Sequence, residues 1–257
     1  MKLLLQRELK QRVPEQDRSV TIVEGKEYLV DETKDFSTKH GTVTAKDLKS
    51  KDGTVIKSNQ NKEFIVLTPT FIDIFTRLRK GPQSINLKDI GTIVAETGVG
   101  KDSIVVDAGA GSGALSSFLA HLVKKVTTYE IKDDYLENIK ENFKQLGLKN
   151  ITLKHADIMK GIAEKKVDLV TLDMPNSAPV VPIATDALAI GGHLVGYCPH
   201  VTQVIQFLEA IRKDARLQHS KTLETIQREW GVDEMRSRPS NAEIGHTAFL
   251  IFARRIK

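Results

Sequence analysis

The chain has 257 residues, of which 40% are hydrophobic and 28% charged, with a formal net charge of +5 from 38 basic and 33 acidic residues. No apolar run approaches the roughly 20 residues of a membrane helix, and charges interrupt the opening sequence MKLLLQRELK too early for a signal peptide, so we expect a cytoplasmic globular protein with no membrane partner. The single cysteine, Cys198, excludes an internal disulfide and a zinc site built from several thiolates.

Residues 1–66 predict a small β domain. Short apolar runs alternate there with turn residues, at Val20–Val23, Tyr28–Val30, Gly41–Val43, Gly53–Ile56 and Phe64–Leu67. Asp52–Gly53 is a turn signal of the type that joins two strands of a hairpin. Residues 67–90 are expected to link this domain to the next, and the apolar spacing of PTFIDIFTRLRK predicts a helix over 69–80.

Strands and helices alternate over residues 91–257, which predicts a second domain of the α/β class. We expect strands at Ser103–Asp107, Val126–Glu130, Ile151–His155, Val167–Leu172 and Gly192–Cys198. Helical patterns occupy 113–123, 134–147, 179–189 and 201–213. Such alternation implies a parallel sheet covered by helices on both faces. A last apolar run, Thr247–Ala253, is expected to pair antiparallel at an edge of this sheet.

The most informative segment is VVDAGAGSGAL, residues 105–115. An apolar run ends at Asp107, and Gly109, Gly111 and Gly113 follow at alternate positions before a helical pattern begins. Glycines in a turn from strand to helix allow backbone dihedral angles that other residues avoid, and they let a ligand lie against the main chain. An acid just before the loop would repel a phosphate and attract a cationic amino-acid group. Because S-adenosylmethionine carries such a group, the loop predicts this cofactor.

Four predicted strands end in or just before an acid, and ligands of open α/β sheets bind at the carboxyl ends of the strands. These acids are Asp107, Glu130, Asp157 and Asp173. We expect Asp107 to support the glycine loop or the amino group of the ligand, Glu130 to accept hydrogen bonds from two ribose hydroxyls, and Asp157 to accept one from an adenine amino group. One such acid alone is more often a helix cap or a solvated turn residue. Four acids at one rim, behind this glycine loop, favour methyl transfer.

An NAD-dependent oxidoreductase is an alternative interpretation of the same loop. Gly109, Gly111 and Ala114 satisfy the permissive dinucleotide fingerprint GxGxxG/A, and Glu130 lies near the usual position of a ribose-binding acid. The acid before the loop, its third glycine, and the acid and proline after the fourth strand disfavour this alternative, because a dehydrogenase has no evident need for them.

Six segments of residues 38–257 resemble, in the same order, those of the tRNA (adenine-58-N1)-methyltransferases, class I enzymes that act in the T-loop. The segments are FIVLTPTFIDIFTRLRKGPQSINLKDIGTIV, DAGAGSGALSSFLA, YEIKDD, LDMPNS, GYCPHVTQV and RSRPSNAEIGHTAFLIFARR. The glycine loop is common to many methyltransferases, whereas the KGPQ and GHTAFL segments are more specific. The resemblance implies a small β domain, a Rossmann-like class I methyltransferase domain, commonly a homotetramer, and methylation of N1 of adenine 58, of adenine 57, or of both. A non-catalytic tRNA-binding subunit on the same fold is a further alternative, which the intact loop and acids disfavour.

The resemblance also implies roles for individual residues. It places S-adenosylmethionine against Ser112, Gly113, Ala114, Leu115, Glu130 and Asp157, with Tyr135 and Gln83 as neighbours. It puts the catalytic acid at Asp173, which would hold the exocyclic amine of the target adenine, and it puts Tyr197 near the base. The chain departs from the family at Asn86–Leu87 in place of an aromatic residue and proline, at Asp107 in place of glutamate, and at Ser177 in place of a second proline.

A basic surplus near both ends of the chain suits a tRNA substrate, although a generically lysine-rich surface would show the same surplus. We expect a platform for the base at Tyr197 and phosphate contacts from Arg79, Lys80, Arg236 and Arg238. The alternatives are equally good: a basic residue can stabilise a helix end, and a tyrosine in an apolar strand can belong to the core. No metal site is predicted, because His200 and His246 lack a second ligand at suitable spacing and are interpreted as structural histidines.

Overall fold

A computed structural model describes residues 1–13, 18–81, 84–233, 236–240 and 245–257, and the chain forms two compact units. Unit 1 comprises Met1–Arg77 and Trp230–Ser240, and unit 2 comprises Leu78–Glu229 and Asn241–Lys257. The predicted linker, residues 67–90, is therefore shared between the units. Residues 230–240, which we expected in the second domain, belong to unit 1. Local sequence patterns do not show such a return, because it depends on contacts between residues far apart in the chain.

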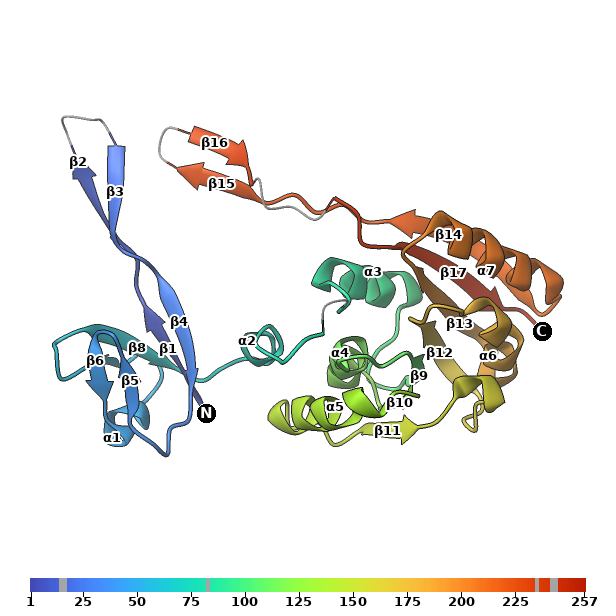
Figure 1. Cartoon of the computed structure of the whole chain (residues 1–257), viewed down its shortest axis with the longest axis horizontal. Helices are drawn as coiled ribbons and strands as arrows, with labels where there is room; N and C mark the ends of the chain where they lie inside the picture. The colour runs from blue at the N-terminus through green and yellow to red at the C-terminus, as the bar shows by residue number, and fades with distance from the viewer. Residues whose placement is uncertain (14–17, 82–83, 234–235, 241–244) are drawn as a thin grey trace. The chain divides into compact units, whose positions relative to one another are not determined.

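Unit 1 consists mainly of antiparallel strands, as predicted (Figure 1). One sheet has the order β4-β1-β8-β7 and contains β1 (Lys2–Gln6), β4 (Lys26–Val30), β7 (Val55–Lys57) and β8 (Glu63–Leu67). Separate two-stranded ladders pair β2 (Leu9–Val13) with β3 (Arg18–Val23), β5 (Phe36–Thr38) with β6 (Gly41–Val43), and β15 (Trp230–Asp233) with β16 (Arg236–Pro239). The buried side chains of Leu4, Phe64 and Val66 lie in the core of the first sheet, which also packs against α1 (Ala45–Leu48).

Two local predictions in unit 1 are corrected. The Asp52–Gly53 turn precedes β7, whereas the β7–β8 hairpin turns over residues 58–62. The helix predicted over 69–80 is limited to α2 (Phe71–Phe75). A capping box between Thr70 and Asp73 sets its start, and the hydrogen bond from the Arg77 amide to the Ile74 carbonyl closes a tighter turn that ends it.

Unit 2 contains a seven-stranded sheet of order β11-β10-β9-β12-β13-β17-β14. Its strands are β9 (Ile104–Ala108), β10 (Lys125–Glu130), β11 (Ile151–His155), β12 (Val167–Leu172), β13 (Leu188–Cys198), β14 (Leu217–Glu224) and β17 (Phe249–Arg255). The ladders from β11 to β13 are parallel, while β17 pairs antiparallel with both β13 and β14. The last apolar run is thus antiparallel as expected, but it lies inside the sheet, and the largely polar strand β14 forms the edge.

Helices cover this sheet. They are α3 (Leu87–Thr97), α4 (Ala114–Leu122), α5 (Asp133–Gln145), α6 (Val181–Ala187) and α7 (Val201–Lys213), with short 3₁₀ turns η2 (Ile158–Lys160) and η3 (Ala178–Val180). Helix α4 packs on β9, β10 and β11, whereas α7 packs on β13, β14 and β17. None of the helices within the described ranges is long and apolar enough to cross a membrane.

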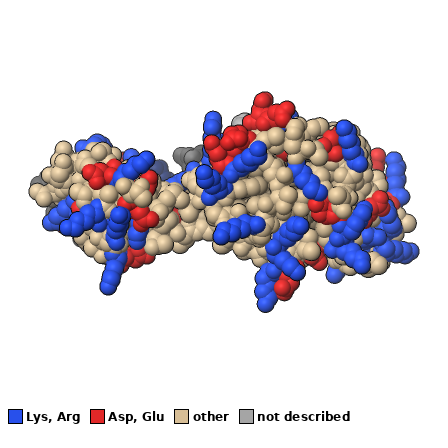
Figure 2. Space-filling model, turned by 90° about the horizontal axis from the view of Figure 1, so that it is seen from below, with Lys and Arg blue, Asp and Glu red and all other residues tan. Residues whose placement is uncertain are grey.

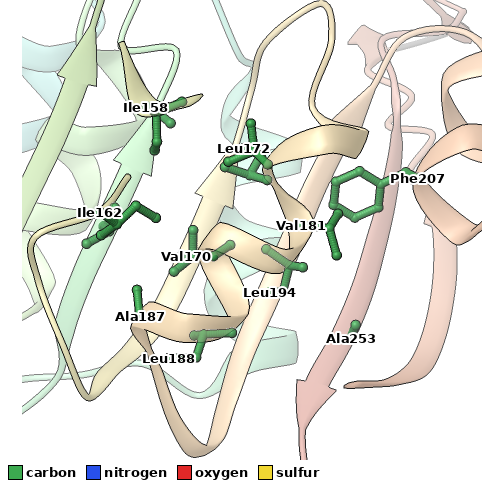
Figure 3. Close-up of a cluster of buried hydrophobic side chains, with 14 of the residues drawn as sticks. Ile158, Ile162, Val170, Leu172, Val181, Ala187, Leu188, Leu194, Phe207 and Ala253 are labelled. Atoms are coloured by element: carbon green, nitrogen blue, oxygen red, sulfur yellow. The ribbon is translucent and has the colours of Figure 1, made fainter. Parts of the chain in front are cut away.

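A buried cluster under α6 and α7 holds the middle of the sheet (Figure 3). Phe207 of α7 and Val181 of α6 face Leu172 and Leu194, which come from β12 and β13. A Cβ atom at Gly196 would lie 2.7 Å from the Phe207 ring, so only glycine lets the ring pack this close to the strand. This packing fixes the carboxyl ends of β12 and β13, where two predicted site residues follow.

Candidate active site

Asp107 lies inside the sheet at the centre of a cross-strand ladder. It pairs in register with Thr128 of β10 on one side and Thr171 of β12 on the other. Both hydroxyls donate to its carboxylate, at 2.8 Å from Thr128 Oγ1 and 2.6 Å from Thr171 Oγ1. Burial raises the pKa of Asp107 above its usual value, and the two hydrogen bonds oppose that rise. Each carboxylate oxygen thus has a threonine partner on a neighbouring strand, two residues before the first glycine of the loop.

The glycine loop turns closely against neighbouring backbone. Gly109, Gly111 and Gly113 have φ angles of +86°, +56° and +76°. A Cβ atom at Gly109 would lie 1.8 Å from the Asp173 carbonyl oxygen, and one at Gly113 would lie 2.9 Å from the Phe143 ring. The loop thus needs glycine both for its dihedral angles and for its close approach to residues after β12 and in α5. Gly113 is the N-cap of α4, whose first residues are the buried Ala114 and Leu115.

Glu130 is the last residue of β10, Asp157 follows the end of β11, and both accept hydrogen bonds from the backbone. Glu130 Oε2 accepts from the Gly111 amide at 2.9 Å, and its Oε1 accepts from the amides of Ile131 and Lys132. Asp157 caps η2 through the hydrogen bond that the Met159 amide donates to Oδ1, at 2.9 Å. Asp157 therefore has the helix-cap role weighed above, with its second carboxylate oxygen unused among the described residues. Tyr135 of α5 packs against a cluster that contains Ile139 of the same helix and Ala110 of the glycine loop.

Asn142 ties the glycine loop to the linking segment, a role that the sequence does not signal. Its Nδ2 donates to the Ser112 carbonyl at 2.9 Å and to the Arg79 carbonyl at 3.1 Å. Ser84 Oγ, in the same segment, lies 2.8 Å from Ser112 Oγ. Because Asn142 is buried, its amide orientation is fixed, and the segment before α3 is held against the loop.

Replacing Asn142 by alanine is expected to lower the free energy of unfolding by about 1–3 kcal/mol and to weaken cofactor binding, because the Ser112 carbonyl loses its amide donor. Asn138 is the matched control, since its Nδ2 donates to the Arg79 carbonyl alone, at 3.0 Å. Urea unfolding and calorimetric titration of Asn142→Ala and Asn138→Ala would measure both effects. Equal losses in the two variants would contradict a special role for the contact to Ser112.

Asp173 follows β12 directly and is held by its backbone. Its amide donates to the Ala108 carbonyl at 2.8 Å, and its own carbonyl lies against Gly109. Within the described ranges, no group donates a hydrogen bond to its carboxyl. Burial, together with the nearby charge of Asp107, raises the pKa of Asp173 to about 8. A half-buried carboxyl without a donor among the described residues is suited to accept a hydrogen bond from a ligand.

The loop after Asp173 is connected to the start of α7. Gln203 Nε2 donates to the Pro175 carbonyl at 3.0 Å, while Gln203 Oε1 accepts from the His200 amide in a capping box. His200 is therefore a helix cap, in agreement with its structural interpretation. Ser177 interacts with the buried Cys198, and burial raises the pKa of that thiol to about 11. Since a thiol with this pKa stays protonated at neutral pH, Cys198 is not a thiolate nucleophile there.

Tyr197 lies at the end of β13, one residue beyond Gly196, which pairs with Leu172 of β12. Tyr197 and Asp173 thus follow paired residues of adjacent parallel strands, and the structure brings them together. The Tyr197 hydroxyl also lies 3.4 Å from Oδ2 of the buried Asp89, a residue that sequence reasoning missed. Asp89 is the acid of the LKD sequence in the KGPQ segment, a segment that contributed only to the family resemblance.

The predicted RNA contacts are distributed over both units. Arg79 and Lys80 are exposed in unit 2, and Arg238 is exposed in the β15–β16 ladder of unit 1. Gln83 and the side chain of Arg236 lie outside the described residues. In the described part of the chain, no group of three His, Cys, Asp or Glu side chains could hold a metal ion.

His246 bridges the ends of two strands. Its Nδ1 lies 2.6 Å from Glu224 Oε1, and its Nε2 lies 2.9 Å from the Pro199 carbonyl oxygen. Both partners are acceptors, so both ring nitrogens donate only in the protonated imidazole. The hydrogen bond to Glu224, followed by that to Pro199, raises the pKa of His246 above its usual value.

Protonated His246 is expected to stabilise the fold fully below the unfolded pKa of about 6.5, and this contribution is lost as the pH rises through the higher folded pKa. Thermal melting of wild type and His246→Gln at pH 6 and pH 9 measures it. The difference in Tm should be larger at pH 6, and Glu224→Gln should reduce that pH dependence. A difference that does not change with pH would exclude this contribution.

Comparison with known proteins supports a methyltransferase site. The family model described as tRNA methyltransferase complex GCD14 subunit matches residues 63–238. The chain is 32% identical to the tRNA (adenine(57)-N(1)/adenine(58)-N(1))-methyltransferase TrmI of Methanocaldococcus jannaschii, over 90% of this chain and 92% of the relative. It is 29% identical to a tRNA (adenine(58)-N(1))-methyltransferase TrmI of Thermus thermophilus, over 82% of this chain and 84% of the relative.

Solved structures agree in fold. A SAM-dependent O-methyltransferase from Thermotoga maritima has a TM-score of 0.80 and 25% identity, covering 100% of this chain and 93% of that chain. The tRNA (m1A58) methyltransferase TrmI from Aquifex aeolicus has a TM-score of 0.76 and 22% identity, with coverage of 100% and 97%, and is similar in fold alone. The predicted class I methyltransferase fold is confirmed.

Proposed function

Since the chain belongs to the tRNA methyltransferase family defined by the GCD14 subunit, we propose that it transfers a methyl group from S-adenosylmethionine to N1 of an adenine in the T-loop of tRNA. The observation that carries the proposal is the half-buried carboxyl of Asp173, which directly follows β12, beside the glycine loop, and has no donor among the described side chains. The relatives compared above are named for methylation of adenine N1.

The residues present fit S-adenosylmethionine. Around Gly111 a Cβ atom would meet only the Gly109 carbonyl oxygen, at 3.8 Å, so this turn leaves room for a ligand against the main chain. Glu130 is anchored to the same turn through the Gly111 amide, and its lone pairs are suited to the ribose hydroxyls. Asp157 has one carboxylate oxygen that no described residue uses, which suits the adenine amino group. When bound, the cofactor supplies an electrophilic methyl group on a sulfonium.

Positioning dominates the proposed mechanism. Adenine N1 already has a lone pair, so no residue has to generate the nucleophile. The adenine ring becomes cationic as N1 is methylated. The carboxylate of Asp173 accepts a hydrogen bond from the exocyclic amine, orients the ring and stabilises the developing positive charge. Tyr197, on the adjacent strand, supplies an aromatic face for the flipped base.

Neither alternative function gains support. The similar proteins reported above are methyltransferases, and relatives in this family include catalytic subunits, such as trmt61a of Dictyostelium discoideum, 26% identical over 75% of this chain. Glu130 is hydrogen-bonded to the glycine loop at Gly111, and Asp107 is hydrogen-bonded to Thr128 and Thr171 of the neighbouring strands. These features disfavour both a nicotinamide enzyme and a degenerate, non-catalytic subunit.

A tRNA substrate fits the charge of the chain. Lys and Arg side chains recur over the face drawn in Figure 2, interspersed with Asp and Glu. Our candidates for phosphate contacts remain Arg79, Lys80, Arg236 and Arg238. We expect the protein to act in the cytoplasm. Whether adenine 58 or 57 is methylated depends on how the tRNA elbow docks and opens.

We also propose that the chain assembles with further copies of itself, as a homotetramer. The β15–β16 ladder has only two strands, which is marginally stable alone, yet its Trp230 and Val232 are 56% and 76% exposed. Pairing with a second copy would cover them. Light scattering of the purified chain tests this, and a monomer at micromolar concentration would contradict it.

The proposed reaction is tested with unmodified tRNA. The purified chain is incubated with tRNA and S-adenosylmethionine, the tRNA is digested, and 1-methyladenosine is mapped by mass spectrometry. We expect it in the T-loop. Its absence, with the tRNA shown to be a substrate for another modifying enzyme, would overturn the proposal.

A further inference from the structure

A buried polar cluster joins three distant segments of unit 2, and the mechanism above does not use it. We define the Asp89 cluster as Lys88, Asp89, Tyr197 and Thr247. Asp89 is completely buried, with Oδ1 at 2.7 Å from Lys88 Nζ and Oδ2 at 2.8 Å from Thr247 Oγ1. Lys88 Nζ also donates to Thr247 Oγ1 at 2.6 Å. The hydroxyl of Tyr197 donates to the same Oδ2 at 3.4 Å.

The cluster is better explained by geometry than by stability. Removing a carboxylate and an ammonium from water carries a large desolvation penalty, and apolar side chains of similar volume are often at least as stabilising. What a satisfied buried network provides is one fixed arrangement of its members. Here it fixes the first turn of α3, the end of β13 and the segment before β17, and α3 is separated from the other two by more than 100 residues along the chain.

Tyr197 connects this cluster to the methyl-transfer site. Its ring extends from the strand next to Asp173, one position beyond the Leu172–Gly196 pair, and its hydroxyl reaches Asp89. The segment before α3 contacts the glycine loop through Ser84 and Ser112. Helix α3 thus makes a polar contact to the predicted base platform through Asp89, and the segment just before it makes one to the predicted cofactor loop through Ser84.

We propose that Asp89, held by Lys88 and Thr247, is a positioning residue that fixes the Tyr197 ring against the target base. This inference rests on the proposed function, since it requires a base at Tyr197. A tyrosine held at both its Cβ and its hydroxyl presents one ring plane, so a base stacked on it places N1 reproducibly. Thr247 holds Asp89 and also interacts directly with the Tyr197 hydroxyl, so its role is in positioning the ring and not in contacting the base.

The test uses the full chain with tRNA and S-adenosylmethionine, and compares Tyr197→Phe, Thr247→Val and Thr247→Ser. Tyr197→Phe keeps the ring and removes the hydroxyl, while Thr247→Val removes the hydroxyl that holds Asp89. Each is expected to lower kcat/KM for tRNA about five- to tenfold, with the Kd for S-adenosylmethionine unchanged. Thr247→Ser should retain the wild-type value. Combining Tyr197→Phe with Thr247→Val should cost no more than Tyr197→Phe alone, because both act on one contact.

Thr92→Val is the matched control. Thr92 Oγ1 donates to the Lys88 backbone carbonyl at 2.8 Å and lies 3.0 Å from Thr225 Oγ1, so it also joins α3 to a distant segment, but its contacts do not include the polar side-chain atoms of the Asp89 cluster. It should leave kcat/KM unchanged. The inference would be overturned by unchanged kinetics in both Tyr197→Phe and Thr247→Val, or by additive losses in the double variant. Methylation of tRNA by the wild-type chain would still support the proposed function in that case. Absence of tRNA methylation by the wild type would overturn both.

Discussion

Replacing Asp173 by alanine is expected to lower kcat for tRNA methylation by about 10²- to 10³-fold while leaving the Kd for S-adenosylmethionine nearly unchanged. The half-buried carboxyl has no donor among the described residues, so its hydrogen-bonding capacity is available to the substrate. The proposed site assigns the cofactor to the glycine loop, Glu130 and Asp157, which this change leaves intact. Single-turnover kinetics and calorimetric titration would separate the two effects. Near-normal turnover would remove Asp173 from the mechanism.

The raised pKa of Asp173 gives this prediction a pH dependence. Activity requires the carboxylate, so kcat/KM of the wild type should rise with pH through about 8. Stability should change in the opposite direction. The folded protein keeps this group protonated while the unfolded chain ionises it, so stability falls as the pH rises from about 4 to about 8.

Asp173→Asn removes the loss of stability that comes from ionising this carboxyl, and the variant serves as the control for folding. Its Tm should exceed that of the wild type at pH 9, and by less at pH 5, because the penalty grows with pH up to the folded pKa. A variant that is inactive yet more stable at pH 9 cannot owe its inactivity to misfolding. A Tm below that of the wild type at both pH values would show that Asp173 has a stabilising role instead.

Replacing Gly109 by alanine is expected to remove more than about 3 kcal/mol of unfolding free energy, or to prevent folding. The added Cβ would lie 1.8 Å from the Asp173 carbonyl oxygen and 2.7 Å from its carbonyl carbon. Both are backbone atoms fixed by the sheet, because the Asp173 amide bonds to the Ala108 carbonyl. Relief would require β9 and β12 to separate at the rim where the site lies.

Gly98 provides the matched control for this prediction. It has a φ angle of +64°, in the same left-handed region, but a Cβ atom there would meet nothing within 4 Å. Gly98→Ala should therefore lose only the conformational term of about 1–2 kcal/mol. Chemical denaturation of both variants isolates the close contact at Gly109. Equal losses would mean that the loop relaxes away from Asp173.

Much of the fold follows from patterns that extend over a few residues. The strands of unit 2 from β9 to β12 begin and end within about two residues of their predicted limits, because each is an apolar run bounded by turn residues. Helix α7 has the predicted bounds, since His200 and Gln203 cap its start. Strands β1 and β2 and helix α3 were not predicted. Strand β2 is largely polar, so the tertiary contacts that stabilise it leave little local signal.

The predicted site also contains some residues that the local sequence identifies and others that only their tertiary contacts identify. Glycines 109, 111 and 113 could be identified from spacing alone, because positive φ angles and close approach are requirements of the local chain. The binding and catalytic roles of the rim acids remain predictions, and the structure adds the partners of each. Asn142 and Gln203 had no signal of their own, because an amide inside a helix acquires a role only from the segment that packs against it. Asp89 lies in the KGPQ segment, but its buried contacts depend on residues far away in the chain.

The sequence by itself determined the alternation of strands and helices, the glycine loop and the acids at the strand ends, since all three are consequences of local periodicity and backbone geometry. Only the tertiary structure decided that β17 lies inside the sheet, that residues 230–240 belong to unit 1, and that Lys88, Asp89 and Thr247 meet Tyr197. These features depend on contacts between residues far apart in the chain. Asp89 is separated from its partners Tyr197 and Thr247 by more than 100 positions. At such distances burial and hydrogen bonding select the partner, and local propensity does not.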